Sequence, residues 1–290
     1  MEFLSYLING ISLGSVYAII ALGYTMVYGI AKMLNFAHGD VIMVGGYISF
    51  SVMSYLNLPG WVSVIISVVV CTILGIVIEG LAYKPLRTAG SLAVLITAIG
   101  VSYFLQNAAL LIWGATPKVY RSLVSGTMRI GSLSISYISI ITIITCLIVM
   151  VGLTLFTSKS KTGKAMRACS EDKGAAQLMG INVNRTISIT FAIGSALAAI
   201  AGVLLCSAYP TLTPTTGAMP GIKAFTAAVF GGIGSIPGAL IGGLLLGIIE
   251  LFAKAYISTQ LSNSIVFAVL IIVLLVRPAG LLGKNVQEKV

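Results

Sequence analysis

Residues 61–82 read WVSVIISVVVCTILGIVIEGLA, and this stretch decides which kind of fold the chain can adopt. Its one charged residue is Glu79, close to its end. About 20 mostly apolar residues are enough for a helix to cross the hydrocarbon core of a bilayer. A helix on the surface of a soluble protein would instead show a polar face. The stretch therefore predicts a membrane-spanning helix.

The composition of the whole chain points the same way. Of the 290 residues, 58% are hydrophobic and only 8% are charged, whereas a soluble domain carries about 25% charged residues. The mean hydropathy is +1.07. The 32 glycines also suit membrane helices, because small residues let two backbones approach closely. These figures exclude a soluble globular enzyme and predict a polytopic membrane protein.

Seven further apolar runs are long enough to be counted as spans, at about residues 7–30, 41–56, 92–113, 135–157, 187–208, 238–256 and 262–277. A ninth stretch, 222–235, is short, rich in glycine and followed by Pro237. We therefore predict an all-α fold, a single transmembrane domain over residues 1–290. It would be a polytopic helix bundle of about eight or nine spans, two of its segments broken or short.

The basic residues predict the orientation, since cytoplasmic loops carry an excess of Lys and Arg. The largest hydrophilic loop, 158–186, holds six of them and should be cytoplasmic. Alternation then places the N-terminus outside and the C-terminal tail in the cytoplasm, provided that 222–235 crosses. The loop 114–133 is an exception, because alternation places it outside despite three basic residues. The net charge of +10 is thus explained by topology, and we expect no nucleic-acid partner.

Two interruptions of the apolar pattern are candidates for a translocation pathway. Residues 34–40 read LNFAHGD and contain the only His, and residues 230–238 read FGGIGSIPG. Broken segments at corresponding positions of two halves are the best sequence indication of a transporter's path. We predict that the path is lined by Asn35, His38, Gly39, Asp40, Gly231, Gly232 and Gly234.

Simpler interpretations of the same residues stay open. Residues 31–40 could form an ordinary cytoplasmic turn with Asn35 or Asp40 as a helix cap, or they could fold back into the bilayer. The glycines at 238, 242, 243 and 247 have the spacing of close helix packing. Glu250 and Lys254 can pair along one helix, and Glu79 is expected beside Lys84. A lone His with no ligand cluster or nucleophile motif predicts neither a metal site nor a catalytic residue.

The polar segment 160–182 reads SKTGKAMRACSEDKGAAQLMGIN and predicts one or two short helices at the membrane surface. Glu171 and Asp172 suit the start of a helix, where negative charge is favoured. The segment could bind anionic lipid headgroups through its basic residues, or it could dock a cytoplasmic partner.

Several motifs resemble a known family. Met166-Arg167-Ala168, Glu171-Asp172 and the run 178–182 resemble the coupling loop of ABC-importer permeases. Within it, Gly174-Ala175-Ala176-x-x-x-Gly180 is similar to the EAA-x-x-x-G pattern, with Gly174 in place of Glu. Further motifs, Asn9-Gly10 to Gly23-Tyr24, LNFAHGD at 34–40, FGGIGS at 230–235 and VRPAGL at 276–281, resemble the permease subunits of bacterial high-affinity branched-chain amino-acid importers over nearly the whole chain.

The resemblance implies a subunit of the bacterial inner membrane that carries branched-chain amino acids and is not itself an enzyme. Its expected partners are a second homologous permease, two cytoplasmic ATPases, an extracytoplasmic substrate-binding protein and membrane lipid. The coupling loop would contact the ATPases through Arg167, Glu171, Asp172, Ala175, Ala176 and Gly180.

The residues fit one part of this scheme independently, because no GxxxxGK[ST] motif is present to hold ATP. We therefore expect no cofactor on this chain, with ATP and Mg on the partner subunits. Two alternatives remain: a permease of the same type for urea or short amides, and an ion-coupled amino-acid transporter that works without an ATPase.

Overall fold

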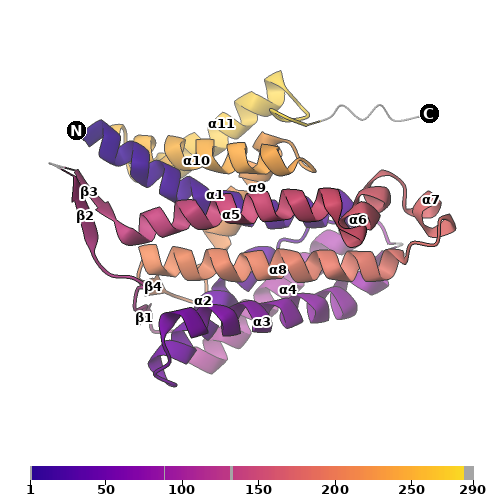
Figure 1. The fold of residues 1–290 in the computed structure, drawn as a ribbon, viewed down its shortest axis with the longest axis horizontal. Helices are drawn as coiled ribbons and strands as arrows, with labels where there is room; N and C mark the ends of the chain where they lie inside the picture. Colours follow the sequence, from indigo (N-terminus) through magenta and orange to yellow (C-terminus); the bar gives the residue numbers. More distant parts are fainter. Residues whose placement is uncertain (1, 88, 131–132, 284–290) are drawn as a thin grey trace.

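The computed structural model describes residues 2–87, 89–130 and 133–283, which form an elongated helix bundle (Figure 1). Its α-helices are α1 (Glu2–Ala31), α2 (His38–Ser54), α3 (Gly60–Ile78), α4 (Ser91–Trp113), α5 (Tyr137–Lys159), α6 (Lys161–Glu171), α7 (Lys173–Leu178), α8 (Val183–Ala208), α9 (Ala218–Gly231), α10 (Ile236–Tyr256) and α11 (Ser262–Val276). A π-helical turn, Glu79–Tyr83, and a 3₁₀ turn, Lys84–Leu86, continue α3. The predicted helical bundle is confirmed.

Each of the nine predicted apolar segments forms a helix, but the helices differ in length. Six helical segments are long and apolar enough to cross a membrane: Glu2–Ala31, Gly60–Leu86, Ser91–Trp113, Tyr137–Lys159, Val183–Ala208 and Ile236–Tyr256. The helices α2, α9 and α11 have 17, 14 and 15 residues, and an apolar helix of that length does not by itself indicate a span. The count of eight or nine spans therefore stays a prediction.

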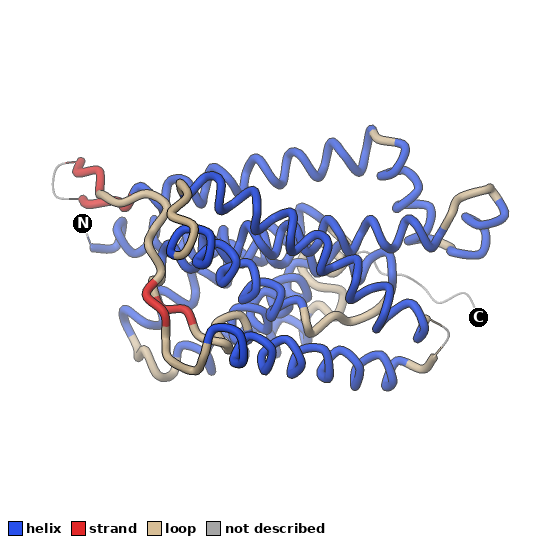
Figure 2. The backbone as a smooth tube through the Cα atoms, turned by 90° about the horizontal axis from the view of Figure 1, so that it is seen from below, coloured by secondary structure: helices blue, strands red, loops and turns tan. Residues whose placement is uncertain are grey.

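Four short strands depart from the all-α prediction. Strand β1 (Lys118–Val119) pairs antiparallel with β4 (Thr211–Leu212), and β2 (Thr127–Ile130) pairs with β3 (Leu133–Ser136). The strands lie at the end of the bundle where α1 begins, and α6 and α7 lie at the opposite end (Figures 1 and 2). The loop 114–133 is thus opposite to the loop 158–186, as alternation requires. Loop backbone that is not in a helix still needs hydrogen-bond partners, and these ladders supply them.

Helix α1 runs through the interior and packs against α10 through glycine. A Cβ added to Gly14 would lie 2.7 Å from Leu244 Cα, and one added to Gly247 would collide with Gly14. Gly243 meets Ala18 of α1 in the same way, and Gly242 meets Ala227 of α9. The prediction that the α10 glycines allow close helix packing is confirmed.

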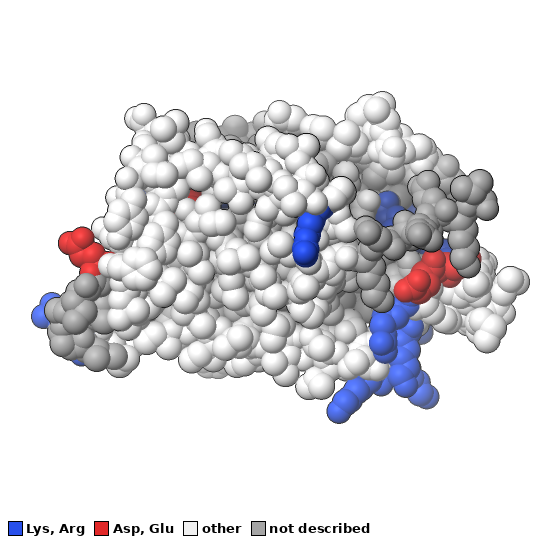
Figure 3. All heavy atoms as spheres, turned by 90° about the horizontal axis from the view of Figure 1, so that it is seen from above, with Lys and Arg blue, Asp and Glu red and all other residues white. Residues whose placement is uncertain are grey.

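The outer face of the bundle is apolar. Large hydrophobic side chains of α3, α4, α5 and α11 are exposed, among them Ile65, Leu111, Ile148 and Leu275. Figure 3 shows a broad uncharged face, with charged side chains gathered mainly toward the two ends. An apolar patch of this extent is not stable in water, so this surface is suited to lipid.

Candidate translocation site

The first interruption lies between α1 and α2. Helix α1 ends at Ala31, Lys32 adopts a positive φ of 58°, and the chain is not helical again until α2 begins at His38. The His38 ring packs against Gly23 and edge-on to Tyr24, with ring centroids 4.6 Å apart. Gly23 precedes the end of α1 by eight residues, so the chain returns about 12 Å along α1. Residues 32–37 therefore re-enter the bundle instead of forming a turn at its edge.

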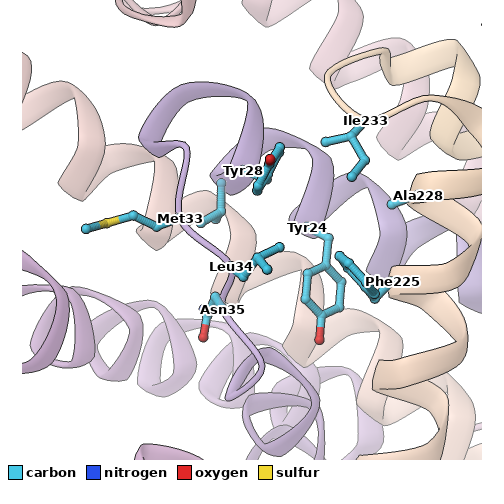
Figure 4. Close-up of a pocket in the computed structure, with 9 residues that line it drawn as sticks. Tyr24, Tyr28, Met33, Leu34, Asn35, Phe225, Ala228 and Ile233 are labelled. Atoms are coloured by element: carbon cyan, nitrogen blue, oxygen red, sulfur yellow. The ribbon is translucent and has the colours of Figure 1, made fainter. Parts of the chain in front are cut away.

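Residues of this re-entrant segment line a narrow crevice between α1 and α9 (Figure 4). The segment forms one wall, α1 the second, and α9 with the following turn the third. The lining residues are Met33, Leu34 and Asn35, then Tyr24, Val27 and Tyr28, then Phe225, Ala228 and Ile233. The two interruptions, about 200 positions apart in the sequence, thus meet at one place.

Asn35 is the one polar residue of the re-entrant segment in the crevice lining. Its side chain is buried, and its amide oxygen accepts a hydrogen bond of 2.8 Å from the Tyr83 hydroxyl. Tyr83 ends the π-helical turn and packs against Phe191 of α8. The amide oxygen keeps a second lone pair, and the NH₂ group donates to no partner among the described residues, so both groups can bind a ligand.

The other residues predicted to line a path in the first interruption, His38, Gly39 and Asp40, face different helices. His38 faces α1, and its Nε2 has no hydrogen-bond partner within the described part of the chain. Gly39 packs so closely on the start of α9 that an added Cβ would lie 2.7 Å from the Gly217 oxygen. Asp40 is buried and accepts a 2.9 Å hydrogen bond from Gln106 of α4. The structure therefore places none of these three residues in the crevice lining, and their role in a path stays a prediction.

The glycines of the second interruption shape a turn. Gly232 and Gly234 have φ values of 104° and 94°, a conformation that favours glycine. Gly231 packs against Gly238, and Gly234 lies beside Gly29. The residue of this turn that lines the crevice is Ile233. Sequence reasoning missed Ile233, Tyr24 and Phe225, because an apolar or aromatic residue in an apolar run carries no distinguishing signal.

A cluster of charges is buried where α1, α9 and α10 meet. The carboxylate of Glu250 accepts hydrogen bonds from Lys223 at 2.7 Å, from Lys254 at 2.5 Å and from the Tyr17 hydroxyl at 2.8 Å. The predicted pairing of Glu250 with Lys254 is confirmed, whereas Lys223 and Tyr17 were not predicted. No spacing rule connects positions 17, 223 and 250, so only the packing of the helices reveals the cluster.

Glu79 is also buried and lies beside Lys84, as expected, since the Lys84 N–H donates to the Glu79 main-chain oxygen. Among the described residues it pairs with Arg87, not with Lys84, and it accepts a 2.6 Å hydrogen bond from Ser188 of α8. Arg87 also donates to Asn184 of α8. These contacts attach the end of α3 to the start of α8.

The loop 158–186 forms two short helices, as predicted. Ser160 caps α6 by accepting from the Gly163 N–H, and Asp172 caps α7 by accepting from the Ala175 N–H at 3.0 Å. Arg167 donates to the Ser158 carbonyl oxygen at the end of α5. The expectation of a carboxylate at a helix start is confirmed for Asp172.

The surface of α7 exposes apolar side chains beside charged ones. Leu178 is 90% exposed and the adjoining Met179 is 82% exposed. Ala175 is exposed as well, Ala176 is buried, and Gly180 has a φ of 82° with open space around it. Contiguous exposed apolar groups mark interaction sites when their patch is large, and these two adjoining side chains make a small candidate patch. In the described ranges, no three His, Cys, Asp or Glu side chains are placed to hold a metal ion.

A family model described as the permease component of the branched-chain amino acid transport system matches residues 6–275. The chain belongs to this family of membrane permease components, and it is a multi-pass membrane protein.

Named relatives resemble the chain over its full length. The high-affinity branched-chain amino acid transport system permease protein BraD of Pseudomonas aeruginosa is 48% identical, over 100% of this chain and 98% of that protein. The corresponding permease protein LivH of Escherichia coli K12 is also 48% identical, with the same coverage. A probable branched-chain amino acid transport permease protein LivH of Methanocaldococcus jannaschii is 30% identical, over 91% of this chain and 88% of that protein.

Proposed function

We propose that the chain is a permease subunit of an ATP-driven importer for leucine, isoleucine and valine, and that the crevice forms part of its path. The observation that carries this proposal is the meeting of the two interrupted segments, 32–37 and 232–235, around one mostly apolar crevice. The printed names of relatives that are 48% identical support the substrate class.

The crevice suits the chemistry of a branched-chain amino acid. The apolar side chain needs an apolar wall, which Leu34, Phe225 and Ile233 supply. The zwitterionic head needs a few polar groups, because a charged group in an apolar environment is costly without hydrogen bonds. The Asn35 NH₂ and the hydroxyls of Tyr24 and Tyr28 are the side-chain polar groups at this place.

The energy source would be supplied by partners. The chain contains no Walker A motif, while α7 presents exposed Leu178 and Met179 at one end of the bundle. This surface supports docking of two cytoplasmic ATPases, which would bind ATP and Mg. The subunit would lie in the inner membrane, with its N-terminus outside and its C-terminus in the cytoplasm. A second homologous permease and an extracytoplasmic binding protein would complete the assembly.

Reconstitution of the whole assembly in liposomes tests the proposal. The chain is co-expressed with the second permease, the ATPases and the binding protein of a branched-chain amino-acid importer, and uptake of labelled leucine is measured with ATP inside. We expect leucine uptake that requires both ATP and the ATPases, and competition by isoleucine and valine. Leucine transport by the chain without any ATPase would establish the ion-coupled alternative. Uptake of urea or short amides without leucine uptake would overturn the substrate class.

A further inference from the structure

The first residue of α7, Lys173, extends its side chain from the surface loop toward α1. Its ammonium donates a 2.7 Å hydrogen bond to the main-chain oxygen of Ala31, the last residue of α1. The two residues are 142 positions apart in the sequence. A surface helix and the end of a central helix are thus joined by one direct contact.

Elementary helix chemistry explains why a lysine suits this position. The last carbonyl oxygens of a helix lack intrahelical donors and carry partial negative charge. An ammonium group supplies both a hydrogen-bond donor and a positive charge. The position also disfavours the charged form of the lysine. Burial lowers the pKa of Lys173, and the nearby charges of Arg87 and Lys32 lower it further. The Ala31 oxygen is therefore the group that compensates the ammonium at this place.

Ala31 lies where α1 gives way to the crevice wall. The next residue, Lys32, has a φ of 58°, and the three residues after it line the crevice. A displacement of the last carbonyl of α1 therefore acts on the start of the re-entrant segment.

The other end of α7 exposes two apolar side chains. Leu178 and Met179 are exposed, while Ala176 is buried in the same core cluster as Ala31 and Met33. With six residues, α7 is about 9 Å long. It is thus a short rigid element with an exposed end and an end bonded to α1.

We propose that Lys173 is a positioning residue that transmits movement of α7 to the crevice through the last carbonyl of α1. The inference rests on the proposed function and names the contact through which the loop 158–186 acts on the path. Lys173 does not need to touch the amino acid itself.

The test uses the complete assembly in liposomes and measures leucine uptake and ATP hydrolysis together. The variants are Lys173→Met, which keeps the alkyl chain and removes the donors, and Lys173→Arg, which restores a cationic donor. Lys164→Met is the control, because Lys164 is an exposed lysine of α6 in the same loop. We expect Lys173→Met to lower leucine uptake per ATP by about tenfold, within the range of typical coupling between sites. The ATPases should still co-purify with Lys173→Met. Lys173→Arg should restore most of the uptake per ATP, and Lys164→Met should leave the uptake per ATP unchanged.

Two results would overturn the inference: an unchanged ratio in Lys173→Met, or loss of the ATPases from that variant, which would make Lys173 a docking residue.

A second readout does not depend on the substrate. Leu34→Cys places a thiol in the crevice lining, while the four native cysteines are buried. In the assembly, we expect trapping of ATP with vanadate to change the rate at which a small thiol reagent labels this cysteine. The change should disappear with Lys173→Met and return with Lys173→Arg. If it persists with Lys173→Met, the inference is wrong. If it disappears as expected while the unsubstituted assembly moves no leucine, the substrate proposal fails and the inference stands.

Discussion

Glu250 shows at the scale of a residue how a carboxylate is kept inside a membrane bundle. Two lysines and a tyrosine hydroxyl share its two oxygens, from three different helices. Lys223 is buried, whereas the Lys254 side chain is 32% exposed. Both charges of the Lys223–Glu250 pair are buried, so removing either one would leave the other without a partner inside the protein.

Replacing Glu250 by Gln should destabilise the protein by about 3–5 kcal/mol, because a buried lysine loses its counter-charge. Thermal unfolding in detergent measures the effect. Lys254→Met should cost much less, since Lys254 already reaches solvent. The double variant Lys223→Met with Glu250→Leu should recover most of the stability. A Glu250→Gln protein as stable as the unsubstituted chain would show that the cluster does not stabilise the bundle.

Ile233 is the residue by which the second interruption reaches the crevice. Ile233→Trp should reduce leucine uptake by about tenfold, on the order of 1.4 kcal/mol, because the larger indole would fill the narrow crevice that Ile233 lines. Initial uptake rates in the reconstituted assembly give the measurement. Ile241→Trp makes the same change on the exposed side of α10 and should leave uptake intact. Equal rates in both variants would argue against the crevice as the path.

At the scale of elements, the segment after α11 completes the end of α9. The Leu281 N–H donates to the Phe230 oxygen at 2.9 Å, and the Leu282 N–H donates to the Gly231 oxygen at 3.0 Å. These bonds satisfy carbonyls that a helix C-terminus leaves without partners. Gly280, with a φ of 78°, fits so closely that an added Cβ would lie 2.6 Å from the Gly232 nitrogen. The VRPAGL motif thus holds the turn that carries Ile233.

Gly280→Ala should loosen this turn and lower the unfolding temperature. A left-handed conformation costs a residue with a Cβ about 1–2 kcal/mol, and the collision with Gly232 adds to that. Gly180→Ala is the control, because Gly180 has a similar φ of 82° but open space around it. Thermal unfolding in detergent should show a clearly larger fall in unfolding temperature for Gly280→Ala than for the control. An equal fall in unfolding temperature for both variants would mean that the contact with Gly232 does not contribute to stability.

At the scale of the whole molecule, the bundle separates its functions along its length. The β-strands and the start of α1 lie at one end, and α6 and α7 lie at the other (Figures 1 and 2). The crevice lies within the bundle, between the end of α1 and α9. This arrangement suits delivery of a substrate at one end and coupling to ATPases at the other.

The exposed apolar side chains of α7 should be required for assembly. Replacing Leu178 and Met179 together by Asp should abolish co-purification of the ATPases, because an apolar contact would be exchanged for two charges that must lose water. Gln177→Asp, which adds a charge on the same exposed helix without removing an apolar group, should retain the ATPases. Normal recovery with the double variant would contradict the docking assignment.

The parts predicted from the sequence are those that depend on local physics. Apolar runs predicted the helices, and the polar cluster at 34–40 and the glycine cluster at 230–238 predicted two interruptions, which the structure places at 32–37 and 232–235. The Glu250–Lys254 pair and the Asp172 cap follow from spacing along one segment. The small β-ladders and the choice of Arg87 as partner of Glu79 were not predicted. Both depend on loop backbone that has no periodic pattern.

By itself, the sequence determined that this chain is an apolar helix bundle, that its helices are interrupted at two places and that the loop 158–186 forms short polar helices. Hydropathy and charge act residue by residue, so their pattern is readable along the chain. Only the tertiary structure decided that Asn35 and Ile233 line one crevice, that Lys223 joins Glu250 and that Lys173 caps α1. These contacts connect positions far apart in the sequence, and the crossing and depth of packed helices select them.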